Sequence, residues 1–249
     1  MKQQRLALLH EIDRQSKVIA LKFASGSLIT EDILKTIIEL YASAQVERVL
    51  VDDFFEAAYH APVTGELEFF IARIIFHFSN EKNLHWKVLL RRQESSVAPD
   101  IRILKDGKTI SIIEIKAKGG WIQPFLSSDR YKNDKIKFEA GHPFNPQDLI
   151  DKQQLQLSKY TSTFNLDADD IFFLLPTMAL VHRKKYNATL EDYYHYFSLT
   201  SKISKDNFIL LSTNLRLDLA FKPDLSALQP TNNFEKMLQR LMNKYNGQI

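Results

Sequence analysis

The first 63 residues carry apolar side chains at helical spacing. A first helix is predicted from four apolar residues on one of its faces, Leu6, Leu9, Ile12 and Ile19. Gly26 ends this helix, and Thr30 is predicted as the N-cap of a second helix because two acids follow it. Residues 46–61 are predicted as a third helical stretch, which stops at Pro62. We therefore expect residues 1–63 to form an all-helical N-terminal region.

The periodicity of residues 64–118 changes from that of a helix to that of strands. A helix that begins near Thr64 would bury a stripe of apolar side chains, namely Leu67, Phe70, Ile71, Ile74, Ile75 and Phe78. The pattern after this helix predicts three consecutive strands, at residues 85–92, 99–104 and 109–118. Isoleucines occupy both faces of the third strand. This favours a central strand that is covered on both sides.

The rest of the chain adds a crossover helix and two further strands. The polar stretch 119–144 is expected to be a long loop, after which Asn145 caps a helix that starts at Pro146. The remaining apolar runs predict two buried strands and a closing amphipathic helix, at residues 170–182, 207–213 and 234–245. The order of elements predicts one α/β domain over residues 64–249, with a mixed central sheet flanked by helices.

Composition narrows the class of protein. The chain has 249 residues, of which 45% are hydrophobic and 25% charged, a balance typical of a folded, water-soluble protein. Its net charge of +3 does not by itself indicate a nucleic-acid partner. The absence of cysteine excludes disulfides, thiolate metal sites and a thiol nucleophile. No apolar run is long enough to cross a membrane or to form a secretory signal, so we expect a cytoplasmic location and no membrane partner.

Two acids and a lysine stand on the second and third predicted strands. Glu114 and Lys116 are two residues apart on one strand, so their side chains share a face. Asp100 begins the preceding strand, and the intervening turn decides whether it joins that face. A two-residue loop at 106–107 would turn Asp100 away. A three-residue loop at 105–107, favoured by its final glycine, would bring the two carboxylates together, and a β-bulge elsewhere would do the same.

Two carboxylates and a lysine on one face are suited to phosphoryl chemistry. Mg²⁺ prefers oxygen ligands and keeps several waters, so one or two acids can hold it. The cation activates water and neutralises charge on an attacked phosphate, and a lysine beside it stabilises the transition state. The plainer interpretation is that Asp100 and Glu114 are polar strand ends and that Lys116 extends its amine to solvent. Against this, a glutamate within an isoleucine-rich strand is costly unless it is paired or coordinated.

This arrangement resembles the PD-(D/E)XK nuclease superfamily, which has the restriction-endonuclease-like fold. The matching residues are Pro99-Asp100 and Glu114-Ile115-Lys116, in the context of a preceding helix and a following crossover helix over residues 64–180. The resemblance implies that Asp100 and Glu114 bind Mg²⁺, with Mn²⁺ as a substitute, and that Lys116 is catalytic. It also implies a supporting glutamate on the preceding helix. Glu66 and Glu68 both qualify, and the apolar stripe slightly favours Glu68.

Further residues are candidates for contact with nucleic acid. Gln156 and Tyr160 look like the Gln-xxx-Tyr helix element of RecB-type nucleases and could reach either the active site or the DNA backbone. Basic side chains at four other positions are candidate phosphate contacts, namely Lys118, Arg183, Lys184 and Lys185. The pair Arg91-Arg92 could also contact phosphates, but for this pair and for residues 183–185 surface charge is the favoured interpretation.

The sequence therefore predicts a metal-dependent nuclease that hydrolyses phosphodiester bonds in DNA. Similarity to restriction endonucleases favours endonuclease action and a homodimer, by fold-level analogy alone. Two alternatives stay open. One is a catalytically inactive relative that binds nucleic acid or a protein through the same fold. The other is a structural or regulatory α/β protein in which the motif is a coincidence.

Overall fold

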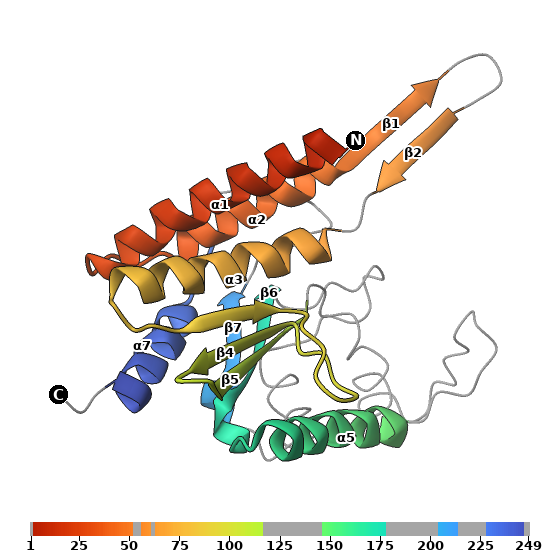
Figure 1. Cartoon of the computed structure of the whole chain (residues 1–249). Helices are drawn as coiled ribbons and strands as arrows, with labels where there is room; N and C mark the ends of the chain where they lie inside the picture. Colours follow the sequence, from red (N-terminus) through yellow and green to blue (C-terminus); the bar gives the residue numbers. More distant parts are fainter. Residues whose placement is uncertain are drawn as a thin grey trace.

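The computed structural model describes residues 2–51, 56–60, 63–116, 146–177, 204–213 and 228–246 (Figure 1). In these ranges the helices are α1 (Lys2–Ala24), α2 (Thr30–Ala44), α3 (Thr64–Glu81), α5 (Pro146–Phe164) and α7 (Asn233–Asn246). The strands are β1 (Gln45–Val51), β2 (Glu56–His60), β3 (Lys87–Leu90), β4 (Ile101–Lys105), β5 (Lys108–Ile115), β6 (Ile171–Thr177) and β7 (Phe208–Ser212). Two 3₁₀ turns precede β6 and β7, at Ala168–Asp170 and Lys205–Asn207. The predicted stretch 119–144 and Asn145 lie outside the described residues.

The main sheet has five strands in the order β3-β4-β5-β6-β7. The first three strands form an antiparallel meander, whereas β5, β6 and β7 pair in parallel. Parallel neighbours need a crossover connection, and α5 lies between β5 and β6 in the chain. The predicted α/β class and the central position of the 109–118 strand are confirmed.

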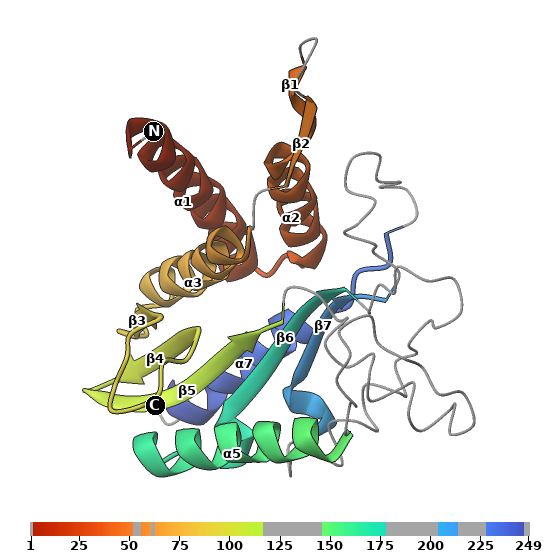
Figure 2. The same cartoon turned by 90° about the vertical axis from the view of Figure 1, so that its right-hand side faces the viewer.

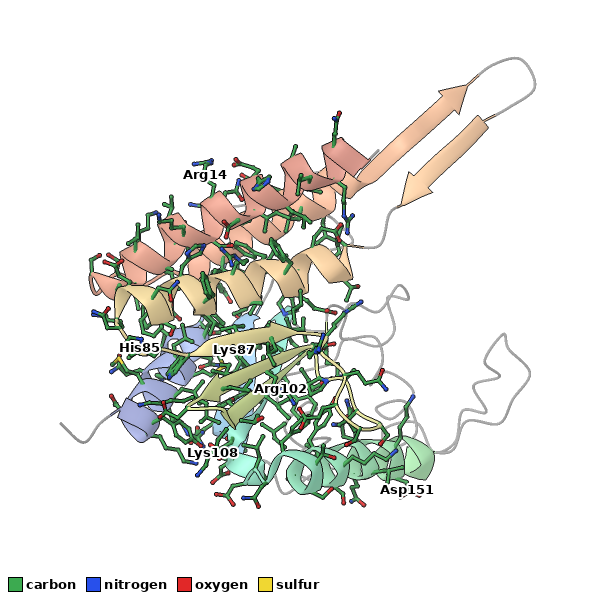
Figure 3. All side chains as sticks on the ribbon, in the orientation of Figure 1. Arg14, His85, Lys87, Arg102, Lys108 and Asp151 are labelled. Carbon is green, nitrogen blue, oxygen red and sulfur yellow. The ribbon has the colours of Figure 1, made fainter. Side chains whose placement is uncertain are left out.

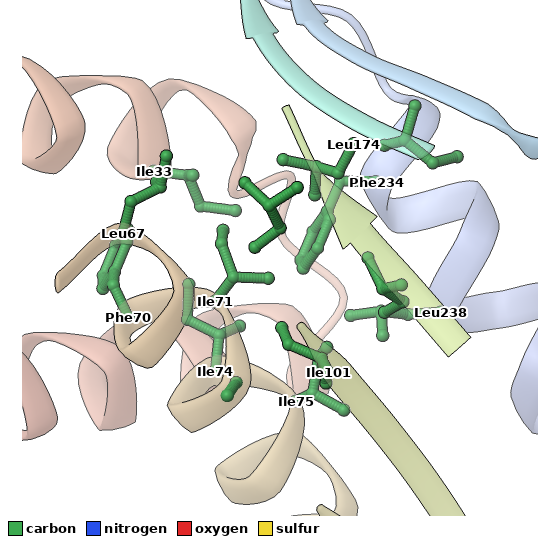
Figure 4. Packing of buried hydrophobic residues seen from close by; sticks show 14 of the residues in the cluster. Ile33, Leu67, Phe70, Ile71, Ile74, Ile75, Ile101, Leu174, Phe234 and Leu238 are labelled. Carbon is green, nitrogen blue, oxygen red and sulfur yellow. The ribbon is translucent and has the colours of Figure 1, made fainter. Parts of the chain in front are cut away.

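Helices cover both faces of this sheet (Figure 2). The helices α3 and α7 lie on one face, with α1 packed on α3 and α2 in contact with both α3 and β7, and α5 lies on the other face. The apolar stripe predicted on α3 is buried, and Ile71, Ile74 and Ile75 face the isoleucines of β4 and β5 (Figure 4). Phe234 and Leu238 of α7 close the same core. No helix in the described ranges has the length and apolar character needed to cross a membrane.

The N-terminus of α2 is capped from a distant part of the chain. The backbone N–H of Ile29 and that of Thr30 each donate to Oε1 of Glu235 at 2.8 Å. The Thr30 hydroxyl donates to Oε2 of the same carboxylate at 2.6 Å. Thr30 is therefore the first helical residue, and the predicted N-cap function is supplied by a buried acid of α7. This contact joins the N-terminal helices to the sheet domain.

The prediction of helix for residues 46–61 is wrong. This segment contains the strands β1 and β2, which pair as an antiparallel ribbon that extends away from α2 (Figure 1). Val46, Val49 and Val51 explain the difference, because β-branched residues lose rotamer freedom in a helix and favour extended backbone. The N-terminal region is thus helical over α1 and α2 but not throughout.

Candidate active site

The turn between β4 and β5 has two residues. Lys105 pairs with Lys108, and the loop residues Asp106 and Gly107 both have positive φ, +50° and +77°. Two consecutive positive φ angles define a type I′ turn, whose twist matches that of the flanking strands. The predicted three-residue loop is therefore wrong. Asp-Gly suits the tighter turn because aspartate tolerates the left-handed region better than most residues do.

A β-bulge in the same hairpin restores the side-chain parity that the prediction required. Leu104 pairs with Thr109, but Ile103 pairs with Ser111, so Ile110 is an extra residue on β5. Beyond the bulge Ile101 pairs with Ile113. The next position along the hairpin sets Asp100 opposite Glu114.

Asp100 and Glu114 are joined through the backbone of the hairpin. The N–H of Ile115 donates to Oδ2 of Asp100 at 2.8 Å, and the N–H of Asp100 lies 3.4 Å from Oε1 of Glu114. Asp100 is partly buried, and only 4% of Glu114 is exposed. The structure therefore brings the two predicted metal ligands together at the carboxyl end of a central strand.

Three side chains donate to the Glu114 carboxylate. The Tyr160 hydroxyl donates to Oε1 at 2.6 Å, and the Gln156 amide donates to Oε2 at 3.1 Å. The Lys116 ammonium lies 3.3 Å from Oε2. Gln156 and Tyr160 reach this point together because they stand four residues apart on α5, and the amide also donates to the Tyr160 oxygen at 2.8 Å. Gln156 and Tyr160 were expected to reach either the active site or the DNA backbone, and in the structure both lie at the strand acids. Their contact with nucleic acid stays a prediction.

Burial and like charge raise the pKa of Asp100. Desolvation has the larger effect, the neighbouring Glu114 carboxylate adds to it, and together they bring the pKa to about 7. The Ile115 N–H and the Lys116 ammonium act in the opposite direction and offset only part of this effect. The pKa of Tyr160 is also raised, by burial and then by the Glu114 charge, so its hydroxyl remains a donor at neutral pH. The site thus has more negative charge than its own cations stabilise.

The two candidate helix acids have different partners. Glu66 forms an ion pair with Arg5 of α1. Glu68 is only 1% exposed and lies near enough to Asp100 to raise the pKa of that aspartate. Both carboxylate oxygens of Glu68 are bound by the guanidinium of Arg91, with Nη2 at 2.5 Å from Oε1. Glu68 is therefore the helix acid at the site, and Glu66 joins α3 to α1.

The donor set suits a hard cation. Within the described ranges, no group of three or more acidic, histidine or cysteine side chains is arranged to hold a metal ion. Two carboxylates of adjacent strands are nevertheless enough for Mg²⁺, which fills its remaining positions with water and phosphate oxygens. Asp100 and Glu114 would hold such an ion. The raised pKa of Asp100 fits this function, because a divalent cation would stabilise the ionised pair.

A second arginine supports the loop that leads to Asp100. Arg102 lies on β4 (Figure 3), two residues after Asp100 and therefore on the same side of the sheet. It is buried and forms an ion pair with Glu94. Its guanidinium lies 4.7 Å from the ring centroid of Phe164 on α5. The sequence did not single out this residue, although its position two residues after Asp100 could have indicated it.

Four predicted phosphate contacts lie outside the described residues, namely Lys118, Arg183, Lys184 and Lys185. Arg91, for which the sequence favours surface charge over a phosphate contact, has a largely exposed side chain and also lies at the site, where it pairs with Glu68. Its backbone N–H donates to the carbonyl of Asp100 at 2.9 Å, one step beyond the Leu90–Ile101 pair of the meander. Strand pairing, which could be anticipated for consecutive strands, is the signal that would have placed Arg91 here.

No family model matches the chain, and neither a curated protein nor a solved structure matches it.

Proposed function

We propose that this protein is a metal-dependent nuclease of the restriction-endonuclease-like fold that hydrolyses phosphodiester bonds in DNA, as an endonuclease. The observation that carries the proposal is the pair of carboxylates, Asp100 and Glu114, opposite one another beside Lys116 at the end of a central strand. The antiparallel meander followed by the crossover helix α5 supports the proposal, because the PD-(D/E)XK superfamily, which the motif resembles, has these elements in the same order.

The balance of charge supports a cation at this position. Three acids, Asp100, Glu114 and Glu68, meet two cations, Lys116 and Arg91. An uncompensated buried carboxylate is costly, so a neutral Asp100 or an added cation is the stable alternative near pH 7. Mg²⁺ is the favoured ion, with Mn²⁺ as a substitute, and when bound it would polarise the scissile phosphate and lower the pKa of water.

The protein's own side chains and backbone position the groups of the site. Tyr160 and Gln156 fix the Glu114 carboxylate, so that its orientation does not depend on solvent. The Lys116 side chain is 23% exposed, and its ammonium lies beside Glu114, where it can orient an attacking water and stabilise charge on the phosphate. The backbone N–H of Ile115 holds Asp100 in a single orientation. These are the functions that an in-line attack on a phosphodiester requires.

One observation favours the alternative of a catalytically inactive, nucleic-acid-binding protein. Glu114 accepts hydrogen bonds from three side chains, one of which is the Lys116 ammonium, and this is also how a purely structural carboxylate is satisfied. The distinction between the two is hydrolysis itself, since both would bind nucleic acid.

The test is cleavage of a mixed panel of supercoiled plasmid and bacteriophage DNA with MgCl₂ in excess over the protein. Wild type is compared with Asp100→Asn, Lys116→Ala and the control Asp167→Asn, which changes an exposed acid before β6. We expect loss of at least about 100-fold in rate for the two site variants and wild-type activity for the control. Cleavage that is equal in all four proteins would contradict the proposed site.

A further inference from the structure

Arg91 is held at the site by an acid that has no other partner among the described residues. Its guanidinium uses Nε and Nη2 to bind both oxygens of Glu68, which is almost completely buried on α3. A planar guanidinium bound at two points cannot rotate freely. The charge of Arg91 is therefore fixed in position by the helix.

The backbone of Arg91 is also constrained. Its φ angle is +45°, in the left-handed region that residues other than glycine rarely adopt. Its N–H donates to the Asp100 carbonyl at 2.9 Å. Non-glycine residues in this region occur disproportionately at functional sites, where the surrounding structure holds them in place. Arg91 is thus held in place directly after β3 and beside Asp100, a predicted metal ligand.

One edge of the guanidinium faces outward. The Arg91 side chain is 56% exposed although its partner Glu68 is 1% exposed. Of its five N–H groups, two are used by Glu68, and the other three have no protein acceptor within the described ranges. Asp100 raises the pKa of Arg91, as Glu68 does more strongly through its hydrogen bonds, so the free edge and the paired carboxylates are electrostatic neighbours. A guanidinium with a free edge matches the oxygens of a phosphate.

We propose that Arg91 binds the phosphodiester that is presented to Asp100 and Glu114, and that Glu68 is a positioning residue for this arginine. This inference rests on the proposed function, and it assigns Glu68 a purpose different from support of the metal. The substrate phosphate would lie between a cation held by the strand acids and the outward edge of Arg91. Such an arrangement contacts both sides of the phosphate and confers no base specificity.

The experiment separates phosphate binding from metal binding. Binding of a 30-base-pair (on the order of three helical turns) fluorescent duplex is measured by anisotropy with Ca²⁺ present, over a range of salt concentrations. Binding of Mn²⁺ is measured by calorimetry without DNA. The variants are Arg91→Ala, Arg91→Lys and Glu68→Gln, and the matched control is Arg92→Ala, which removes the same charge from the adjacent, exposed position.

We expect Arg91→Ala to weaken duplex binding at least about tenfold and to lower the salt slope by about one, with the affinity for Mn²⁺ unchanged. Arg91→Lys and Glu68→Gln should fall between this variant and wild type, because charge is kept but the fixed fork is lost. The affinity of Arg92→Ala for the duplex should stay within about threefold of wild type, because an exposed ionic contact contributes little.

The double variant Glu68→Gln/Arg91→Gln serves as a control for loss of folding, because it leaves no unpaired buried charge. It should bind the duplex as weakly as Arg91→Ala. Equal duplex binding by the Arg91 and Arg92 variants would overturn the inference, as would weakened Mn²⁺ binding by Glu68→Gln. If wild type binds duplex through Arg91 but never cleaves DNA, the proposed function fails while this inference stands. A wild type that binds no duplex overturns the inference, whatever its affinity for Mn²⁺.

Discussion

The Tyr160 hydroxyl of α5 donates a hydrogen bond of 2.6 Å to Oε1 of Glu114 on β5. Tyr160 is 4% exposed, so this bond lies inside the protein. It joins the crossover helix to the strand that carries Glu114 and is followed directly by Lys116. The position of the Glu114 carboxylate is therefore set by the packing of α5 on the sheet.

Tyr160→Phe removes this donor and leaves the ring in place. We expect a loss of about 2 kcal/mol in the free energy of unfolding, because a buried carboxylate loses a charge-assisted hydrogen bond. DNA cleavage should fall as well, since Glu114 is less firmly oriented. Urea denaturation and initial cleavage rates measure the two effects.

Tyr41→Phe is the matched control for this prediction. Tyr41 of α2 is also buried, and its hydroxyl has no hydrogen-bond partner within the described ranges. The free energy of unfolding of this variant should stay within about 0.5 kcal/mol of wild type. If both tyrosine variants behave alike, the Tyr160–Glu114 hydrogen bond does not stabilise the fold.

Asp100→Asn should change how stability depends on pH. The pKa of Asp100 is raised from 3.8 to about 7 by burial and by Glu114, so the folded state binds a proton that the unfolded state releases between these values. Stability from this group is therefore present below pH 4 and is lost as pH rises through 7. Without divalent ions, the free energy of unfolding of Asp100→Asn should exceed that of wild type by on the order of 2 kcal/mol at pH 8 and by less at pH 5. A difference that is constant with pH would contradict this, and Asp167→Asn is the control.

Glu235→Ala should destabilise the contact between the N-terminal helices and α7. Three donors at Ile29 and Thr30 would lose their acceptor in a buried environment, at an expected cost of about 3 kcal/mol in the free energy of unfolding. Glu235→Gln retains one acceptor oxygen and should lose roughly half as much. Glu31→Ala removes an exposed acid in the first turn of α2 and should cost under about 0.5 kcal/mol. Equal losses for Glu235→Ala and Glu31→Ala would show that the cap is unimportant.

The hairpin shows how far sequence reasoning reached. The shared face of Asp100 and Glu114 follows from strand periodicity once the parity of the hairpin is known. Spacing alone does not decide the turn type, because Gly107 suits both loop lengths, and no local pattern indicates the bulge at Ile110, a residue that is buried in the core. The correct parity came from the bulge, the alternative that the sequence left open.

Two other features depend on tertiary contacts. Glu66 and Glu68 are indistinguishable by spacing, and they are separated by their partners, Arg5 on α1 and Arg91 after β3. Glu235 caps a helix some 200 residues earlier in the chain, which no local signal could indicate. In contrast, α3, β5, α5 and α7 follow from strong hydrophobic periodicity and were predicted within a few residues.

Calorimetric titration of the protein with Mn²⁺ measures whether Asp100 and Glu114 together bind a divalent cation. Wild type and Asp167→Asn should bind the ion with the same affinity, which should weaken as pH falls below 7 because Asp100 becomes protonated. Asp100→Asn and Glu114→Gln should each weaken binding by at least about tenfold. Equal affinity in all four proteins, or no binding to wild type at millimolar Mn²⁺, would contradict binding by this pair.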